Sequence, residues 1–201
     1  MSIRSELFKK SLLGLKPYAD YFVWRKGIEL EDGSMGPPNN WVSVHGGSAW
    51  TYREERKAYY LHQFGPEQPD LNYYHTDVVQ EMHSVMKFWL NKGVDGFSMG
   101  SASYLAEHRE FLDEPLSNNI RDPQLYDYTN KVYTRNQEQS YEIVQGWRKV
   151  LDEFKPAKHL IIDTHTNVSY AMKYYDYGAK YPLNYELISD VDKRWSVSEH
   201  L

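Results

Sequence analysis

The chain has 201 residues, of which 41% are hydrophobic and 25% are charged, and its formal net charge is −5. These values are those of an ordinary globular protein, and because no basic block is present we expect no nucleic-acid partner. The chain has no cysteine, which excludes disulfide bonds and thiolate metal sites.

The first part of the chain, residues 1–75, predicts a loop-rich region without a helix. Glycine, proline and asparagine cluster at 33–40 and again at 46–47, which are turn signals. Aromatic runs at 20–24 and 59–62 favour short strands between these turns. Four aromatic side chains in this region either form a small core, which we favour, or a platform for a sugar ring. They are Tyr21, Trp24, Trp41 and Trp50.

Residues 76–92 carry the clearest helical pattern in the sequence. Apolar residues recur every three or four positions, and Thr76 is a suitable N-cap. Gly93 suits the left-handed residue that often ends a helix. The next residues, 94–100, predict a strand. A helix that leads directly into a strand is the repeating unit of α/β proteins.

The second half of the chain repeats this order with a longer connection. Residues 101–136 are polar and irregular, and loops of this length are often functional. An amphipathic helix is predicted at 137–154, where Pro156 ends it, and the apolar strand 159–163 follows. No further strand–helix unit is predicted after residue 167. The fold class is therefore α/β with a parallel sheet.

Several polar residues are candidates for chemistry, and their patterns favour structural roles. Asp70 follows Pro69, so we expect it to accept hydrogen bonds from nearby backbone N–H groups; the alternative is that it organises a loop beside an active site. Glu107 is expected to be a solvated or capping charge. His159 and His165 lie some 20 Å apart along a straight strand, so no zinc site is predicted.

Seven short runs together identify a family. They are PPNNWVSVHGGSAW (37–50), YYLHQF (59–64), QPDLNY (68–73), GVDGF (93–97), DEPLSN (113–118), QGWRKVLDEF (145–154) and TNVSYAMKYY (166–175). With these runs the chain resembles the insect maltase and oligo-1,6-glucosidase branch of glycoside hydrolase family 13, the α-amylase superfamily. The resemblance covers essentially the whole chain from Leu7 onward.

The resemblance implies the fold of that family, a (β/α)8 barrel with a small domain B inserted after the third strand. Residues 1–75 resemble the domain B insertion, and 76–201 resemble the barrel segment around strands 4 and 5 with the neighbouring helices. A complete barrel needs about 250 residues. We therefore expect an α/β fold that is a partial (β/α)8 TIM barrel with an inserted domain B.

The resemblance also implies retaining glycoside hydrolysis, which uses two carboxyl groups about 5–5.5 Å apart. The family's nucleophile lies in the motif G-F-R-x-D-A; this chain has Gly100 in place of that acid and Ser98 in place of the arginine that orients it. The family's acid/base glutamate lies in E-A-Y-T-N, where this chain has the shorter Asp163. Asp95 lies at an odd separation from Gly100, so it faces the other side of the strand and is not expected to replace the nucleophile.

The expected function is that of a maltase-like α-glucosidase homologue in carbohydrate metabolism, inactive because position 100 is a glycine and the barrel is incomplete. An α-linked gluco-oligosaccharide is the expected ligand, with Phe64, Asp70 and Asn167 as candidate substrate contacts. The alternative is a non-catalytic interaction or sugar-binding protein related to amino-acid-transporter heavy chains. Association with a full-length maltase is a further expectation.

The sequence specifies neither a cofactor nor a cellular compartment. No cofactor is predicted; the resemblance allows calcium, but no compact acidic loop specifies it. No apolar run approaches the ~18 residues of a membrane span, and the N-terminal residues have no apolar signal-peptide core. The family is typically secreted or membrane-anchored, so localisation stays open. Asn167 heads the sequon Asn167-Val168-Ser169, which we expect to be glycosylated only if the chain is secreted.

Overall fold

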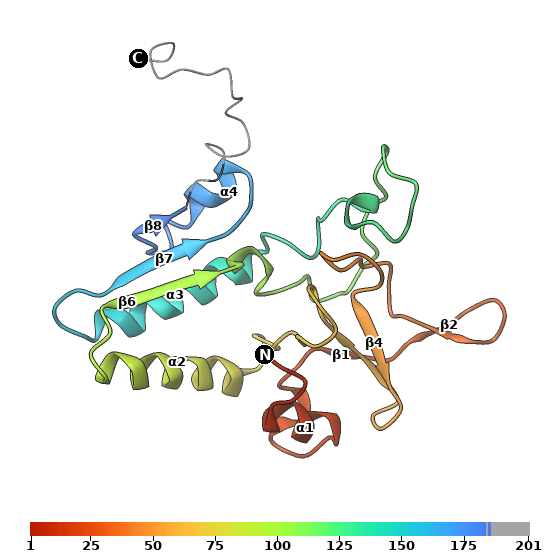
Figure 1. The fold of residues 1–201 in the computed structure, drawn as a ribbon, viewed down its shortest axis with the longest axis horizontal. Coiled ribbons are helices and arrows are strands. Elements are labelled where there is room, and N and C mark those ends of the chain that lie inside the picture. The colour runs from red at the N-terminus through yellow and green to blue at the C-terminus, as the bar shows by residue number, and fades with distance from the viewer. Residues whose placement is uncertain (184, 186–201) are drawn as a thin grey trace, which may run out of the picture.

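A computed structural model describes residues 1–183 and residue 185. Figure 1 shows two lobes: one holds α1 and the strands β1 to β5, and the other holds α2, α3 and α4 with the strands β6 to β8. One hydrophobic core runs through both lobes, because Phe8 and Trp24 from the first belong to the same buried cluster as Trp147 and Leu160 from the second.

The first lobe contains short antiparallel strands and one helix. The helix α1 spans Glu6–Leu12, and Ser5 caps it by accepting a hydrogen bond from the Phe8 N–H. The expectation of no helix before residue 75 was therefore wrong: a helix of two turns is too short for a clear periodicity, and its stability comes from burying Phe8. The remaining elements are η1 (Tyr18–Asp20), β1 (Trp24–Arg25), β2 (Ile28–Glu29), β3 (Met35–Gly36), β4 (Trp50–Arg53) and β5 (Ala58–Leu61), with sheet orders β1-β5-β4 and β2-β3.

The second lobe follows the predicted order of helix, strand, helix and strand. The helix α2 spans Thr76–Asn91 and β6 spans Gly96–Gly100; α3 then spans Glu138–Asp152 and β7 spans His159–Asp163. The N-cap of α2 is His75 and not Thr76, because the His75 Nδ1 atom accepts the hydrogen bond from the Asp77 N–H at 3.2 Å. Gly93 has a φ of +95°, as expected for the residue that ends this helix.

A third parallel strand was not expected. The helix α4 spans Val168–Lys173, and β8 spans Tyr181–Pro182, which pairs in parallel with β7. The prediction that no strand–helix unit follows residue 167 was wrong, because these elements are too short to leave a periodic pattern. The sheet order is β6-β7-β8, so the structure contains three adjacent strands of an open sheet rather than two.

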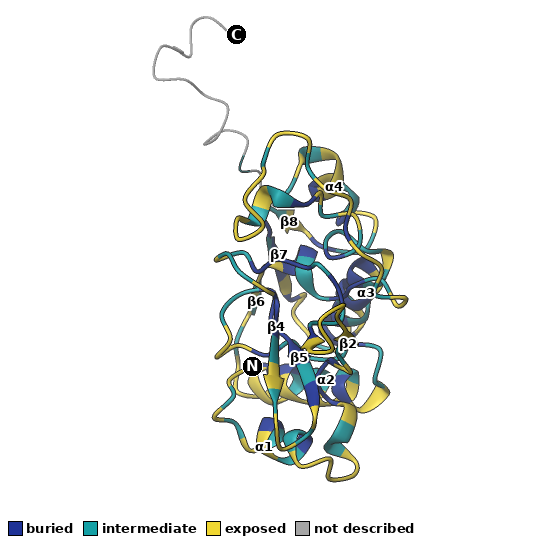
Figure 2. Ribbon diagram, turned by 90° about the vertical axis from the view of Figure 1, so that its right-hand side faces the viewer, coloured by how far each residue is buried: buried dark blue, intermediate teal, exposed yellow. Residues whose placement is uncertain are grey.

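The sheet has two different faces. Leu160 and Ile162 are fully buried and pack, with Phe97 and Met99, into the core formed with α2 and α3. Figure 2 shows buried residues along β7 and the inner side of α3. Since side chains alternate along a strand, the opposite face carries the side chains of the remaining positions. These positions are Gly96, Ser98 and Gly100 from β6, and His159, Ile161 and Asp163 from β7.

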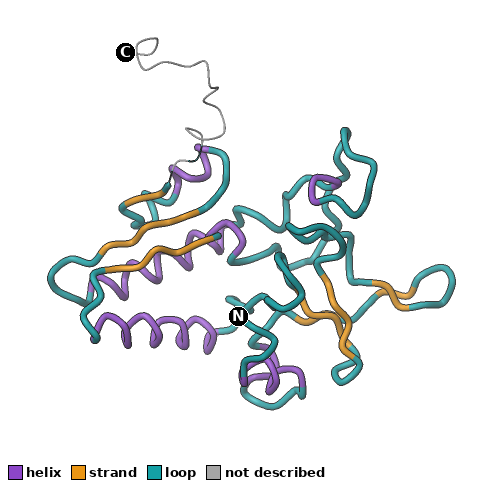
Figure 3. The backbone as a smooth tube through the Cα atoms, in the orientation of Figure 1, coloured by secondary structure: helices purple, strands orange, loops and turns teal. Residues whose placement is uncertain are grey.

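The connection between β6 and α3 is mostly loop, as Figure 3 shows, with the short turns η2 (Ala102–Tyr104) and η3 (Tyr126–Tyr128). This loop folds back onto the first lobe. Asn40 donates to the Glu114 carbonyl oxygen at 2.9 Å, and the Trp41 indole donates to the Leu112 carbonyl oxygen at 2.9 Å. The predicted domain boundary at residue 75 stays a prediction, and residues 184 and 186–201 of the predicted barrel segment lie outside the described residues.

The four aromatic residues of the first lobe are packed in cores. Trp41 and Trp50 stack at 5.8 Å in a small cluster, and Trp41 also stacks on Phe111 from the long loop at 5.4 Å. Tyr21 and Trp24 belong to the main core. All four lie at or below 7% exposure, which confirms the core interpretation and excludes a sugar platform at these positions.

Candidate functional site

The predicted site residues meet at the carboxyl end of the parallel sheet. Gly100 and Asp163 are the last residues of β6 and β7, and they are direct partners in the strand register. Neighbouring strands lie about 4.8 Å apart. A side chain at position 100 would therefore lie beside the Asp163 carboxyl group, on the sheet face that the helices do not cover.

Position 100 is open. A Cβ atom built on Gly100 would have no other heavy atom within 4 Å, and the residue does not have a positive φ. Ser98 lies two residues earlier on the same exposed face. The next residue, Ser101, has a left-handed φ of +57°, and its N–H donates to the Asp163 carbonyl oxygen at 2.6 Å. The backbone at position 100 therefore leaves room for a side chain.

The Asp163 carboxyl group is held by a residue that the sequence did not indicate. The Tyr185 hydroxyl donates a hydrogen bond to the Asp163 Oδ1 atom, and this bond raises the pKa of Tyr185. The Tyr185 ring stacks on His165 with centroids 3.9 Å apart. Tyr185 lies 22 residues after Asp163 in a weakly patterned segment, so only the return of the chain after β8 brings the two together.

A pocket of about 180 Å³ collects three of the predicted site residues. Phe64, Asp70 and Gly100 line it, together with Ser101 and Tyr104. The Phe64 and Tyr104 rings meet edge to face at 5.1 Å. Two further predicted residues, Asp163 and Asn167, are not among the residues that line this pocket. The candidate site thus consists of an aromatic, partly acidic pocket with Asp163 next to its Gly100 wall.

Asp70 forms the expected local hydrogen bonds and has an unusual environment. Its Oδ2 atom accepts the Gln63 N–H at 3.0 Å, as expected for an aspartate that binds nearby backbone donors. Burial raises the pKa of Asp70 to about 7. The side chain therefore fixes the turn that brings Phe64 to the pocket.

Glu107 contradicts its prediction. It is only 3% exposed, and burial raises the pKa of its carboxyl to about 8, with a further rise from Asp70 and an opposing effect from Arg25. The expectation of a solvated or capping charge was wrong because the chain leaves η2 inward: the His108 N–H donates to the Tyr133 carbonyl oxygen at 2.8 Å, which holds this segment against the long loop.

Asn167 is a helix cap in this structure. Its Oδ1 atom accepts from the Ser169 N–H at 2.9 Å and from the Ser169 hydroxyl at 2.8 Å, which begins α4. The residue is exposed, so the sequon is accessible. Its role as a substrate contact stays a prediction.

The other candidate groups lie away from the site. Asp95 precedes β6 at the far end of the sheet, where Lys158 lies 3.3 Å from its carboxylate, so it does not approach Gly100. Within the described residues, no three His, Asp or Glu side chains gather where they could hold a metal ion. In the same part of the chain, no helix is long and apolar enough to cross a membrane.

Comparison with known proteins places these features in a family. The sequence profile described as "Alpha amylase, catalytic domain" matches residues 1–194. The α-glucosidase of Apis mellifera is 49% identical over 192 residues, which cover 96% of this chain and 34% of that protein. A human amino acid transporter heavy chain, SLC3A1, is 37% identical over 152 residues, which cover 73% of this chain and 22% of that protein.

A solved structure has the same arrangement. The α-glucosyl transfer enzyme XgtA superposes with a TM-score of 0.72 at 30% identity, over 81% of this chain and 31% of that chain. The chain therefore spans about a third of the length of the relatives that it matches, or less. Because the family profile covers nearly the whole chain, and parallel strands end at the two positions where the motifs predict catalytic acids, the chain belongs to the α-amylase family, glycoside hydrolase family 13.

Proposed function

We propose that this chain acts in carbohydrate metabolism as a maltase-like homologue that binds an α-linked gluco-oligosaccharide and does not hydrolyse it. The observation that carries the proposal is the pairing of Gly100 with Asp163 at the ends of β6 and β7. A retaining hydrolase needs a carboxylate on one side of the glycosidic bond and a carboxylic acid on the other. Here only one of the two paired positions carries a carboxyl group.

The chemistry that remains is that of an acid without a nucleophile. Asp163 can donate a proton to a leaving oxygen, but no neighbouring carboxylate attacks the anomeric carbon, so no covalent intermediate forms. Ser98 adds no positive charge that would orient an acid at position 100. Asp70 lines the same pocket, but its carboxyl is bound to the Gln63 amide and it lies outside the paired strands. Binding of a sugar beside Phe64 and Tyr104 does not need the missing acid.

The test separates binding from turnover. Purified chain is mixed with maltose, binding is measured by calorimetry, and released glucose is measured enzymatically. We expect binding without glucose release, and weaker binding by Phe64→Ala. Release of glucose by the unaltered chain would refute the proposed inactivity, and absence of any maltose binding would refute the proposed ligand.

The effect of a side chain at position 100 can be tested directly, because a Cβ atom at Gly100 would meet no other heavy atom within 4 Å. The double variant Ser98→Arg/Gly100→Asp restores both motif residues, and Ser98→Arg/Gly100→Asn is its matched control with no carboxylate. Glucose release by the first variant alone would show that the lack of a carboxylate at position 100 causes the loss of hydrolysis. Equal inactivity of both would show that positions 98 and 100 alone do not account for the loss.

A second candidate function is that of a non-catalytic interaction partner. It is favoured by the match to a transporter heavy chain and by the exposed apolar side chains on α2, where Val85, Phe88 and Trp89 are 41%, 54% and 49% exposed. Co-purification with a full-length maltase under mild conditions tests it. The variant Phe88→Glu/Trp89→Glu should then lose the partner, and retention of the partner would rule out this face.

A further inference from the structure

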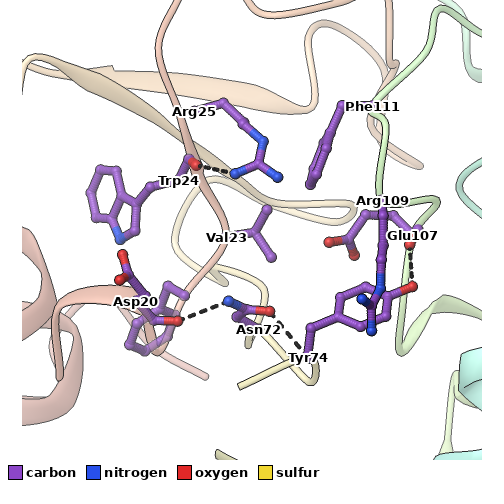
Figure 4. A pocket seen from close by; sticks show the side chains of 10 residues that line it. Asp20, Val23, Trp24, Arg25, Asn72, Tyr74, Glu107, Arg109 and Phe111 are labelled. Carbon is purple, nitrogen blue, oxygen red and sulfur yellow. Dashed lines mark hydrogen bonds between the residues drawn. The ribbon is translucent and has the colours of Figure 1, made fainter. Parts of the chain in front are cut away.

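A second and larger cavity lies between the two lobes, away from the Gly100 pocket. Its volume is about 310 Å³, at the lower end of the range of small-molecule sites. Figure 4 shows side chains from β1, from the turn before α2 and from the segment after η2 facing the same space. The residues used below are Val23, Arg25, Tyr74, Glu107, Arg109 and Phe111.

Glu107 is the most buried ionisable side chain of this cavity. Its side chain points into the space, and among the described residues no other residue donates a hydrogen bond to its carboxyl group. The backbone around it is fixed, since the Tyr74 hydroxyl donates to the Glu107 carbonyl oxygen at 2.8 Å. A buried carboxyl group with so few partners normally has a ligand, a water molecule or an ion beside it.

Two arginines flank this carboxyl and are held by aromatic rings. The Arg25 guanidinium lies 3.7 Å from the centroid of the Phe111 ring, and Arg25 Nη1 donates to the Trp24 carbonyl oxygen at 3.2 Å. The Arg109 guanidinium lies 4.3 Å from the Tyr74 ring centroid. No ion pair between Glu107 and either arginine is found in the part of the chain that the structure describes. The guanidinium groups therefore keep N–H donors free to face a ligand.

From this arrangement we propose that the cavity is a second binding site, for a neutral polyhydroxylated molecule of about the size of one sugar ring. A hydroxyl group donates and accepts at once, so one diol can donate to the Glu107 carboxyl and accept from Arg25 or Arg109. A cation would be opposed by the two arginines, and an anion would place its charge against the buried acceptor oxygen of the Glu107 carboxyl. Val23 and the edge of Phe111 give the cavity an apolar side for the carbon atoms of the ligand. The inference does not depend on sugar binding at the Gly100 pocket.

The test is a titration of the full, isotopically labelled chain with D-glucose, followed by backbone-amide NMR shifts. We expect shifts at Val23, Tyr74 and Arg109 with a millimolar dissociation constant. Glu107→Leu should weaken this binding about tenfold, as expected for the loss of one buried polar contact. Glu107→Gln should retain binding, because an amide also donates and accepts. The control Glu110→Leu changes an exposed neighbour and should leave the affinity unchanged.

Further arms separate this site from the first and from other ligands. Asp163→Asn should leave the shifts at Val23 and Tyr74 unchanged, whereas glucose bound at the sheet end would shift Gly100 and Ser101. Sodium phosphate and guanidinium chloride, at matched ionic strength, should cause smaller amide shifts around this cavity than glucose does. The proposal is overturned if glucose causes no shift around this cavity, if phosphate or guanidinium binds better, or if Arg25→Met leaves the affinity unchanged. The Arg25 variant keeps the test valid should Glu107→Leu fail to fold.

Discussion

The buried carboxyl of Glu107 makes the stability of this protein depend on pH in a direction that can be calculated. An unfolded glutamate ionises near 4.5, whereas burial raises the pKa of Glu107 to about 8 in the folded chain. Between these values the folded state holds a proton that the unfolded state has lost. The stability that this group contributes is complete below about pH 4.5 and is lost progressively as the pH rises through 8.

The magnitude follows from the two pKa values. The slope is about −1.4 kcal/mol per pH unit for one proton, so between about pH 5.5 and pH 7.5 Glu107 lowers the free energy of unfolding by about 2.5 kcal/mol. Asp70, whose pKa is raised to about 7 by burial, acts in the same direction. Burial lowers the pKa of His62 and of His83, which makes stability rise with pH below neutrality and opposes the trend.

The assay isolates Glu107 from these other groups. Urea unfolding of the parent and of Glu107→Gln is compared at the two pH values, because the amide cannot ionise and all other groups are shared. The parent should lose about 2.5 kcal/mol more than the variant, or about 1 M in the urea midpoint. Glu110→Gln, an exposed neighbour, should behave as the parent does. Parallel pH dependence in parent and Glu107→Gln would refute the burial of a carboxyl group at this position.

Two further predictions concern parts of the fold that support the site. Glu114, 2% exposed, accepts hydrogen bonds from the N–H groups of Val132, Tyr133 and Thr134 and from the Thr134 hydroxyl; Glu114→Ala should therefore cost on the order of 3 kcal/mol and speed amide hydrogen exchange at 132–134, and unchanged exchange would contradict this role. Asn167→Ala removes the cap of α4 and should cost about 1 kcal/mol in thermal unfolding, whereas Asn167→Asp, which can still cap, should cost less; equal loss in both variants would argue against capping.

The sequence predicted the central elements of the second lobe well because each has a strong local pattern. The apolar periodicity of α2 and α3 and the apolar run of β7 arise from burial on one side or on both, and burial is what those patterns record. Gly93 marked a helix end through a backbone conformation that glycine favours. The elements that were missed, α1, α4 and β8, span seven, six and two residues, and segments this short leave no clear periodic pattern in the sequence.

The residues of the candidate site also fall into those that the sequence predicted and those that it did not. The motif around Gly100 and the apolar strand that ends at Asp163 are each contiguous in sequence, so both positions could be predicted as site residues. The strand register confirms that the two positions are neighbours; their catalytic roles stay a prediction. Glu107 was misjudged because its burial depends on the long loop packing back over it. Tyr185 could not have been found, because its contact with Asp163 spans 22 residues without a pattern.

By itself the sequence determined the family, the order of the helices and strands between residues 76 and 163, and the absence of an acid at position 100, because these are properties of residue type and short-range periodicity. Only the tertiary structure decided which side chains share a cavity. The contacts of Phe64 with Tyr104, of Asp163 with Tyr185, and of Arg25 with Phe111 join residues between 22 and 86 positions apart. Such contacts form through packing of both lobes around one core, and no local pattern in the sequence specifies them.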